Sequence, residues 1–312
     1  SVSWVTYTVV LLIGLAMLYP IIWMFFATFK SNAEIFGSVK LLPSSFSFQS
    51  YIDGWHVNSK ITYTTFFKNS FVMTIITTLF TVLSSAIVAY GFARYQFPGK
   101  KILFGILIAT LMLPGAVVMI PRYAMFNKLG LVDTYWPFYL QGLLSVNSFF
   151  VFMLIQFIRG LPRELDESAY LDGCSDLKVF VKILVPLMKP ALFSAGLFQF
   201  MWTYNDYTNV LIYINSVKKY TLSLALRLSL DAESVVQWNK VMAMSFLSIL
   251  PLIILFFAAQ KYFVEGLNLN RNAEKHTGSE SFFTVNMKST LGTIGQCQTL
   301  VHVVESDTHG SV

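Results

Sequence analysis

The residues whose types and spacing could do chemistry are concentrated in one polar stretch, residues 159–189. Four carboxylates stand close together near its start, at Glu164, Asp166, Glu167 and Asp172. Carboxylates are favoured in the first turn of a helix, proline suits its first position, and glycine suits the left-handed residue that ends it. Because Pro162 precedes the carboxylates and Gly173 follows them, the sequence predicts a short acidic helix.

A second short helix is predicted in the same stretch. Ser175 or Asp176 can cap its start. Apolar residues then recur at helical spacing, at Leu177, Phe180, Val181 and Leu184. Pro186 and Pro190 interrupt the backbone before the next apolar run begins. The stretch is therefore expected to form a helix–turn–helix.

Two interpretations of this helix–turn–helix are open: a connector that lies on lipid headgroups, or a docking element for another protein. The first helix carries four carboxylates and only one basic residue, Arg163. An anionic membrane surface repels such an acidic face. Ser168 and Ala169 are small enough to let another backbone approach closely. The composition therefore favours docking into a groove of a partner protein.

A second candidate for chemistry is Asp206, the one charge in the apolar run 190–217. A carboxylate within a membrane span is a functional residue by default. The alternative is that Asn205 and Asp206 lie at the end of a helix, just after Trp202, and cap backbone groups there. Both interpretations stay open.

The apolar run 102–121 contains two prolines, Pro114 and Pro121, and Gly115 follows the first. Proline removes a backbone donor and bends a helix. In a membrane, a broken helix is tolerated where it packs against protein or lines a cavity. We therefore expect this run to bend and to line a pathway, although simple packing also explains Gly115.

Catalytic chemistry finds no support in the chain. At the one Gly-Lys pair, Gly99-Lys100, a phosphate-binding loop would need glycine at Arg94 and serine or threonine at Lys101. The apolar runs hold no cluster of histidine, cysteine and carboxylate, and Cys297 with His302 matches no metal-ligand spacing. We predict that the chain is not an enzyme and that it binds no metal or cofactor.

The elements that must position these residues are membrane helices. Of 312 residues, 55% are hydrophobic and 12% are charged, against about 25% charged in soluble domains. This composition excludes an ordinary soluble domain and a disordered protein, and two cysteines exclude a disulfide scaffold. Six runs are long enough to span a bilayer: residues 1–29, 69–93, 102–121, 134–158, 190–217 and 241–260. They contain no charged residue except Asp206. None alternates with period two, so the sequence predicts an all-α polytopic membrane protein with six transmembrane helices.

The basic residues favour a topology with both termini in the cytoplasm. The cytoplasmic connectors, 94–101 and 159–189, then hold eight Lys and Arg in 39 residues. The external connectors, 28–68, 122–133 and 218–240, hold ten Lys and Arg in 76 residues. The helix–turn–helix falls between the fourth and fifth helices on the cytoplasmic side. A cleaved signal peptide at 1–29 is disfavoured because this run lacks a basic start and a clear cleavage site.

Aromatic residues gather in the connectors predicted to be external. Four of them open the fourth helix, at Tyr135, Trp136, Phe138 and Tyr139. An aromatic belt at headgroup level is the ordinary interpretation, and stacking of a ring on a sugar is the alternative. The sequence becomes polar and unpatterned further on, so we predict a transmembrane domain at 1–265 and an unstructured tail at 266–312.

The helix–turn–helix resembles the cytoplasmic EAA loop of permeases in binding-protein-dependent ABC importers. That loop has the pattern E-A-A-x-x-x-G, nine residues, and then I-x-L-P. Here the pattern is met with its spacing intact, from Glu167 to Gly173 and from Ile183 to Pro186. Ser168 replaces the middle alanine and Val185 replaces the leucine, in each case by a residue of similar kind.

Further segments resemble the carbohydrate-uptake branch of this family, and in particular the shorter permease of maltose-type importers, over about residues 1–266. They lie at 69–70, 89–94, 97–101, 119–123, 129–131, 205–207 and 260–266. The resemblance implies that the region around Asp206 faces the translocation cavity. The candidate pathway residues are therefore Pro114, Trp202, Asn205, Asp206 and Tyr207.

The resemblance implies a type I ABC importer permease that moves a saccharide, most simply an oligosaccharide, by alternating access across a bacterial or archaeal cytoplasmic membrane. Its partners would be a second homologous permease, an ABC ATPase dimer that binds ATP and Mg²⁺, and an extracytoplasmic solute-binding protein; nucleic acid is not expected. The residues that would dock on the ATPase are Glu164, Glu167, Ser168, Ala169, Leu171, Asp172, Gly173, Ile183 and Pro186.

Two rival functions were weighed against this one. A secondary transporter driven by an ion gradient needs ionisable residues near the membrane midplane, and Asp206 is the one candidate. A membrane-embedded hydrolase needs a nucleophile and a base, which the apolar runs do not supply. The sequence therefore favours the ATP-driven importer.

Overall fold

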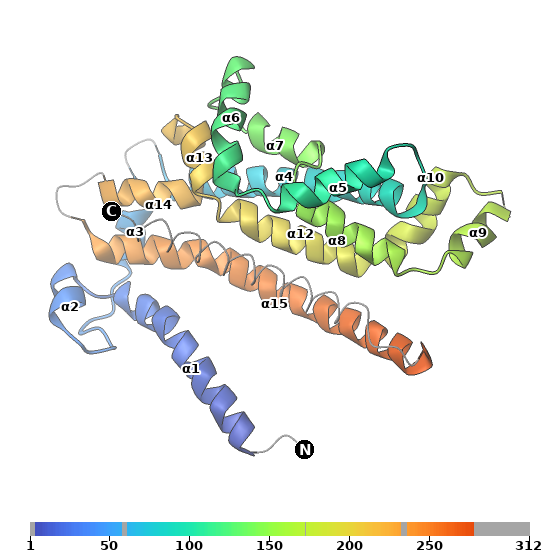
Figure 1. Ribbon diagram of the computed structural model, residues 1–312. Coiled ribbons are helices and arrows are strands. Elements are labelled where there is room, and N and C mark those ends of the chain that lie inside the picture. The colour runs from blue at the N-terminus through green and yellow to red at the C-terminus, as the bar shows by residue number, and fades with distance from the viewer. Residues whose placement is uncertain (1–3, 58–60, 172, 232–235, 278–312) are drawn as a thin grey trace, which may run out of the picture. The chain divides into compact units, whose positions relative to one another are not determined.

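A computed structural model describes residues 4–57, 61–171, 173–231 and 236–277 of the chain. Apart from one isolated bridge between His56 and Thr62, regular structure in these residues is helical (Figure 1). The long helices are α1 (Trp4–Ala27), α4 (Tyr63–Arg94) and α15 (Trp238–Thr277). The shorter ones are α2 (Asn32–Gly37), α3 (Gln49–Trp55), α5 (Lys100–Leu111), α6 (Gly115–Lys128), α7 (Trp136–Leu143), α8 (Ser148–Arg159), α9 (Glu164–Leu171), α10 (Asp176–Val179), α11 (Val185–Leu187), α12 (Lys189–Tyr204), α13 (Thr208–Tyr213) and α14 (Leu222–Asp231).

Apolar helices of membrane-spanning length account for the predicted spans. Four stretches are long and apolar enough to cross a bilayer, namely Trp4–Ala27, Tyr63–Arg94, Trp136–Arg159 and Trp238–Gln260. Two bent helix pairs bring the number to six if each pair is one span: α5 with α6, and Asp176–Leu187 with α12. Each predicted charge-free run overlaps one of these six. The all-α polytopic architecture expected from the sequence is confirmed.

The third span turns sharply at Pro114. The axes of α5 and α6 differ by 106° across residues 112–114. Pro114 precedes α6 with extended backbone (φ −60°, ψ 133°), and a proline disfavours helical backbone in the residue before it. Pro121 lies inside α6. The bend expected from the prolines is confirmed, and it occurs at Pro114.

The helices α4 and α7 lie side by side (Figure 1). They approach closely at Gly142, where a Cβ would stand 2.9 Å from Thr81 Oγ1 and 3.0 Å from the Thr77 carbonyl oxygen. Ser84 Oγ donates a hydrogen bond of 2.6 Å to the Gly142 carbonyl. Small and hydroxyl-bearing residues let helices approach closely within a membrane, so these four residues define the crossing.

The described residues divide into two compact units, one drawn from residues 4–158 and 191–258 and the other from residues 159–190 and 259–277. The first unit holds two clusters of buried apolar side chains. One cluster joins the start of α4 to α12, α14 and α15 through Tyr63, Phe66, Tyr204, Leu222, Ala225, Ala243 and Met244. The other joins α4, α6, α7 and α13 through Met73, Phe126, Phe138, Val210 and Tyr213. These clusters fix the ends of the helices that carry the candidate pathway residues.

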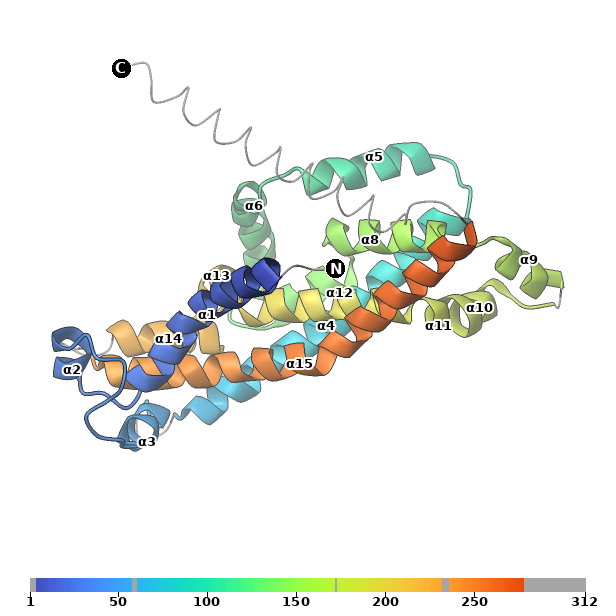
Figure 2. The same ribbon diagram turned by 90° about the horizontal axis from the view of Figure 1, so that it is seen from below.

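The last helix continues past the predicted domain boundary at residue 265. Helix α15 runs to Thr277, as Figure 2 shows, so residues 266–277 are helical, where the sequence predicted an unstructured tail. No proline follows Pro251 in this segment, and a single interior glycine, Gly266, costs only about 1 kcal/mol relative to alanine. The rest of the predicted tail, with Cys297 and His302, lies outside the described residues.

Candidate functional site

The predicted acidic helix forms as α9, whose last residue is Leu171, and Gly173 follows shortly after it. Gly173 has φ +76°, its N–H donates to the Tyr170 carbonyl at 3.0 Å, and the Cys174 N–H donates to the Ala169 carbonyl at 3.0 Å. These two hydrogen bonds, together with a glycine in left-handed backbone, form the Schellman motif that ends a helix. The predicted stop is confirmed. The helix begins two residues after Pro162, so that proline precedes its first turn.

The second predicted helix is interrupted by a π-turn. Helix α10 follows Ser175, which occupies the cap position with extended backbone, and residues Phe180–Leu184 then form a π-helical turn. In this turn the Val185 N–H donates to the Phe180 carbonyl, five residues back. Pro186 follows directly and has no N–H for an ordinary helical bond. The π-helical turn therefore comes immediately before Pro186. Turns of this kind often mark functional segments.

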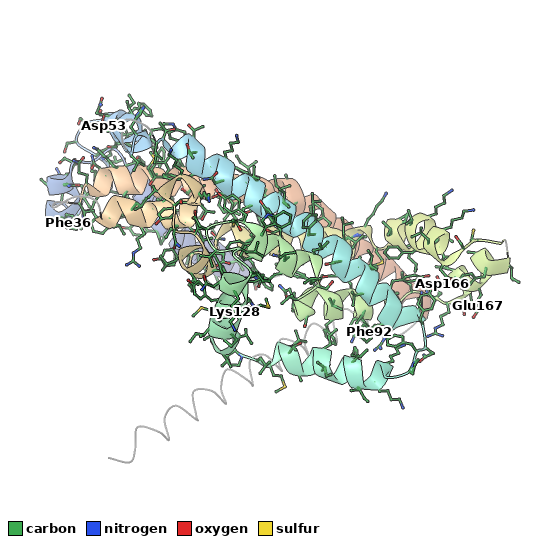
Figure 3. The ribbon with its side chains drawn as sticks, turned by 90° about the horizontal axis from the view of Figure 1, so that it is seen from above. Phe36, Asp53, Phe92, Lys128, Asp166 and Glu167 are labelled. Carbon is green, nitrogen blue, oxygen red and sulfur yellow. The ribbon has the colours of Figure 1, made fainter. Side chains whose placement is uncertain are left out.

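Most of the predicted docking residues are exposed. Figure 3 labels Asp166 and Glu167 on α9, where Asp166 is buried and Glu167 is exposed. The exposed docking residues are Glu164, Glu167, Ser168, Leu171, Gly173 and Pro186, whereas Ala169 is buried and Ile183 is half-buried. Asp172 lies outside the described residues. Leu171 is 89% exposed, so this surface presents an apolar side chain among carboxylates.

Of the candidate pathway residues, Asn205 and Asp206 act as helix caps. Asn205 Nδ2 donates to the Met201 carbonyl at 2.9 Å, at the end of α12. The Asp206 carboxylate accepts bonds from Asn209, 3.0 Å from its backbone N–H and 2.8 Å from its Nδ2. The capping interpretation is confirmed for both residues.

The remaining pathway candidates occupy two places. The ring of Trp202 is 49% exposed and packs against Phe149 and Phe150, at centroid distances of 5.4 and 5.2 Å. Tyr207 lies between α12 and α13, and its hydroxyl accepts a bond of 2.5 Å from Arg227. Pro114 lies at the bend between α5 and α6. The sequence did not single out Arg227 as a neighbour of this group.

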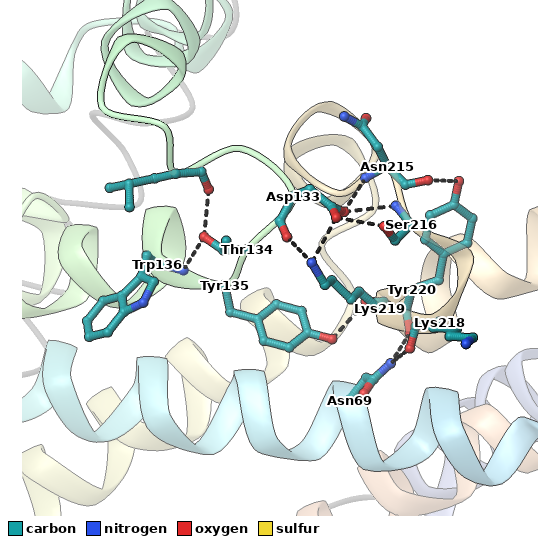
Figure 4. Close-up of polar contacts among 11 residues, drawn as sticks. Asn69, Asp133, Thr134, Tyr135, Trp136, Asn215, Ser216, Lys218, Lys219 and Tyr220 are labelled. Carbon is teal, nitrogen blue, oxygen red and sulfur yellow. Dashed lines mark hydrogen bonds and ion pairs between the residues drawn. The ribbon is translucent and has the colours of Figure 1, made fainter.

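A polar network that the sequence did not predict joins the connector before α7 to the connector after α13 (Figure 4). Asp133, in left-handed backbone at φ 61°, pairs with Lys219 Nζ at 2.8 Å. Its carboxylate also accepts bonds from Ser216 and from the backbone N–H of Asn215. The Lys219 ammonium and the Ser216 bonds hold the pKa of Asp133 well below its ordinary value. The carboxylate therefore stays charged over the physiological pH range.

The same network is anchored on α4. Asn69 Nδ2 donates to the carbonyls of Lys218 at 2.8 Å and Tyr220 at 3.0 Å, and Ser70 Oγ accepts from the Leu222 N–H at 2.8 Å. The sequence showed Asn69 and Ser70 as the start of an apolar run and as part of the family resemblance, and it gave no partner for either side chain. Elsewhere, Arg122 donates to Gln141 Oε1 at 2.7 Å and ties α6 to α7.

Bent and straight apolar helices of spanning length, joined to a polar helix–turn–helix, are the architecture of an integral membrane protein. The described residues contain no group of three or more His, Cys, Asp and Glu that could hold a metal ion. The chain belongs to the family of binding-protein-dependent transport system inner membrane components, whose model matches residues 81–268.

Curated relatives agree with the family. The chain is 33% identical to the probable ABC transporter permease protein YurM of Bacillus subtilis, over 81% of this chain and 83% of the relative. It is 32% identical to the arabinooligosaccharides transport system permease protein AraQ of Bacillus subtilis, over 83% and 92%. It is 29% identical to the trehalose/maltose transport system permease protein MalG of Thermococcus litoralis, over 82% and 92%.

A solved structure shares the fold. A chain of a bacterial ABC transporter involved in the import of the acidic polysaccharide alginate matches with a TM-score of 0.69 at 26% identity, over 83% of this chain and 95% of that one. The protein is therefore an inner-membrane permease subunit of an ABC transporter, and it is not an enzyme. The family works with an ATPase and a solute-binding protein, as its sequence resemblance implied.

Proposed function

We propose that this chain forms part of the pathway through which an ATP-driven importer moves a saccharide, most simply an oligosaccharide, and that residues 159–189 couple this movement to a separate ATPase dimer. The observation that carries the coupling role is the geometry of α9. An exposed acidic helix with an exposed leucine ends in a Schellman turn at Gly173. Such a helix fits the groove of a partner protein.

Each docking residue has a proposed role in coupling. Glu167 is exposed on α9 and pairs with a basic side chain of the ATPase. Gly173 sets the turn through its left-handed backbone, and Pro186 sets the direction in which the chain enters α12. Closure of the ATPase dimer around ATP then displaces α9, and the membrane helices respond by opening toward the other side.

The saccharide substrate is inferred from relatives. Those named above are permeases for arabinooligosaccharides and for trehalose and maltose, and the solved neighbour imports alginate. Trp202, Asn205, Asp206, Tyr207 and Pro114 are the proposed pathway residues. The caps that Asn205 and Asp206 form leave Asp206 bound to Asn209, which weakens the ion-driven alternative because that alternative depends on Asp206.

The proposed assembly has both termini and α9 in the cytoplasm, in agreement with the distribution of basic residues. It contains a second homologous permease, two ATPase subunits that carry ATP and Mg²⁺, and an extracytoplasmic solute-binding protein. This chain itself binds no cofactor in the proposal.

Cysteine cross-linking within the complete importer tests the coupling role. Single cysteines placed at exposed positions of α9, such as Glu164 and Leu171, should capture the ATPase in a background in which Cys174 and Cys297 are both replaced by serine. Cysteines in the apolar middle of α1 serve as matched controls and should capture no ATPase. Absence of cross-links from every α9 position would overturn the assignment. Uptake into vesicles with ATP and without an ion gradient separates the importer from an ion-driven transporter.

A further inference from the structure

A cavity of about 330 Å³ opens beside the start of α4, next to the polar network of Asp133 and Lys219. Its lining is contributed by α4, by the chain that enters α7 and by the connector after α13: Asn69, Thr134, Tyr135, Trp136, Tyr139 and Lys219. Figure 4 shows most of these residues. The volume falls at the lower end of the range for small-molecule sites, which is about 300–1,000 Å³.

Aromatic rings make up one wall of this cavity. The Tyr139 ring lies 6.3 Å from the Tyr135 ring and 5.9 Å from the Trp136 ring, measured between centroids, so the three rings hold one another in place. The Trp136 side chain remains 52% exposed. An aromatic face carries partial negative charge and accepts polarised C–H groups, which a sugar ring presents on its less polar face.

Polar groups stand next to these rings with bonding capacity to spare. Both hydrogens of Asn69 Nδ2 are used on the carbonyls of Lys218 and Tyr220, which leaves the Asn69 Oδ1 as an acceptor. Within the described part of the chain, Trp136 Nε1 and the Tyr139 hydroxyl make no hydrogen bond. One acceptor, one donor and one hydroxyl therefore accompany an aromatic wall, as a ligand with several hydroxyl groups requires.

The charge in the cavity is balanced. Lys219 Nζ lies 2.8 Å from Asp133 Oδ2 and also donates to the Asp133 carbonyl, so its ammonium is already neutralised. A phosphate or a uronate carboxylate would have to compete with Asp133 for this lysine. A neutral ligand does not, because it needs only the rings and the uncharged polar groups.

We propose that this cavity is a subsite for one unit of a neutral saccharide, stacked on Trp136 and hydrogen-bonded by Asn69 Oδ1 and Tyr139. The inference rests on the proposed function, because it assumes a saccharide cargo. It narrows that function in two ways. It places a sugar contact on this subunit at the junction of α4, α7 and the connector after α13, and it selects neutral over acidic units.

The test measures binding of defined probes to the complete importer in lipid nanodiscs, without the solute-binding protein, by saturation-transfer NMR. Maltotriose and arabinotriose represent neutral saccharides, trigalacturonate an acidic one, and glycerol 1-phosphate a lipid headgroup. We expect at least one neutral probe to bind, with affinity reduced about tenfold by Trp136→Ala and several-fold by Tyr139→Phe. Trp238→Ala is the matched control, because Trp238 also begins a span but packs on Phe36, and it should leave binding unchanged.

The outcomes are distinct. Tighter binding of trigalacturonate or glycerol 1-phosphate, or equal binding by wild type and both cavity variants, overturns the subsite. Tyr139→Phe removes one hydroxyl only, so it keeps the test valid if Trp136→Ala proves unstable. Uptake of the same saccharides by the importer with its solute-binding protein is measured in parallel. If the importer takes up saccharides normally and the cavity variants bind them as wild type does, the subsite alone is refuted. If the importer takes up none of the saccharides, the proposed function is refuted and the subsite with it.

Discussion

Replacing Gly142 by alanine tests the close crossing of α4 and α7. The added Cβ would stand 2.9 Å from Thr81 Oγ1 and 3.0 Å from the Thr77 carbonyl oxygen, at the limit below which Cβ atoms essentially never approach other atoms. The Thr81 side chain can rotate away, whereas the Thr77 oxygen yields only if the helices separate. Overpacking of this kind costs about 1–3 kcal/mol, and the higher helix propensity of alanine returns about 0.5–1 kcal/mol. We therefore expect a net loss of roughly 0–2.5 kcal/mol in the free energy of unfolding, centred near 1 kcal/mol.

The measurement is unfolding of the full chain in mixed micelles by titration with SDS, followed by circular dichroism. Gly91→Ala on α4 is the matched control, because a Cβ there meets nothing within 4 Å. Gly196→Ala on α12 is a second control, with its nearest atom at 3.8 Å. Both controls should be neutral or slightly stabilising. Combining Thr81→Ala with Gly142→Ala should recover only part of the loss, because the Thr77 contact remains. Equal stability of Gly142→Ala and Gly91→Ala would refute the reasoning.

Four further predictions address coupling, the polar network and the caps. Glu167→Lys should abolish ATP-dependent uptake while membrane insertion, followed by protease protection, persists; uptake at the wild-type rate would contradict a docking role. Gly173→Ala should reduce stability by about 1 kcal/mol and should also reduce uptake, because Gly173 has φ +76°. Gly173→Asn should have a smaller effect, because asparagine tolerates left-handed backbone. Identical effects of the two variants would count against the Schellman turn. The pKa of Asp133 is lowered in the folded chain from an unfolded value of about 3.9, so its ion pair stabilises the fold above about pH 4, and this contribution is lost as the pH falls further. The melting temperature should therefore drop more steeply between about pH 5 and 3 for wild type than for Lys219→Met, and parallel curves would oppose this. Asp206→Ala should cost about 1 kcal/mol of stability through the lost cap, whereas Asp206→Asn should keep that stability because its side-chain oxygen still accepts from the Asn209 N–H; equal destabilisation by both variants would contradict the capping role.

Local sequence signals predicted the spans and the polar helices because their causes are local. A run without charge is read directly from the chain, and the left-handed stop at Gly173 follows from a glycine placed after an acidic helix. The caps formed by Asn205 and Asp206 bond to residues within four positions. Such interactions depend on spacing alone, so the sequence was sufficient to name them.

Long-range partners could not be predicted in this way. Asp133 and Lys219 are separated by 86 positions, and Asn69 reaches a carbonyl 149 positions away. Each of these residues is unremarkable in its own segment, since the pairing depends on how α4, α7 and α13 pack. The sharpness of the turn at Pro114 is a second example, because a proline predicts a bend but its angle depends on the surrounding helices.

Asn69 and Ser70 have a consequence for motion during transport. These two adjacent side chains of one 32-residue helix bond to backbone atoms at Lys218, Tyr220 and Leu222. Tyr135 adds a bond from its hydroxyl to the Lys219 carbonyl. Any rotation of α4 therefore carries this connector along as part of the same rigid body. A sugar bound at that place would travel with the helix and keep its contacts, so its affinity would stay constant while the rest of the pathway rearranges.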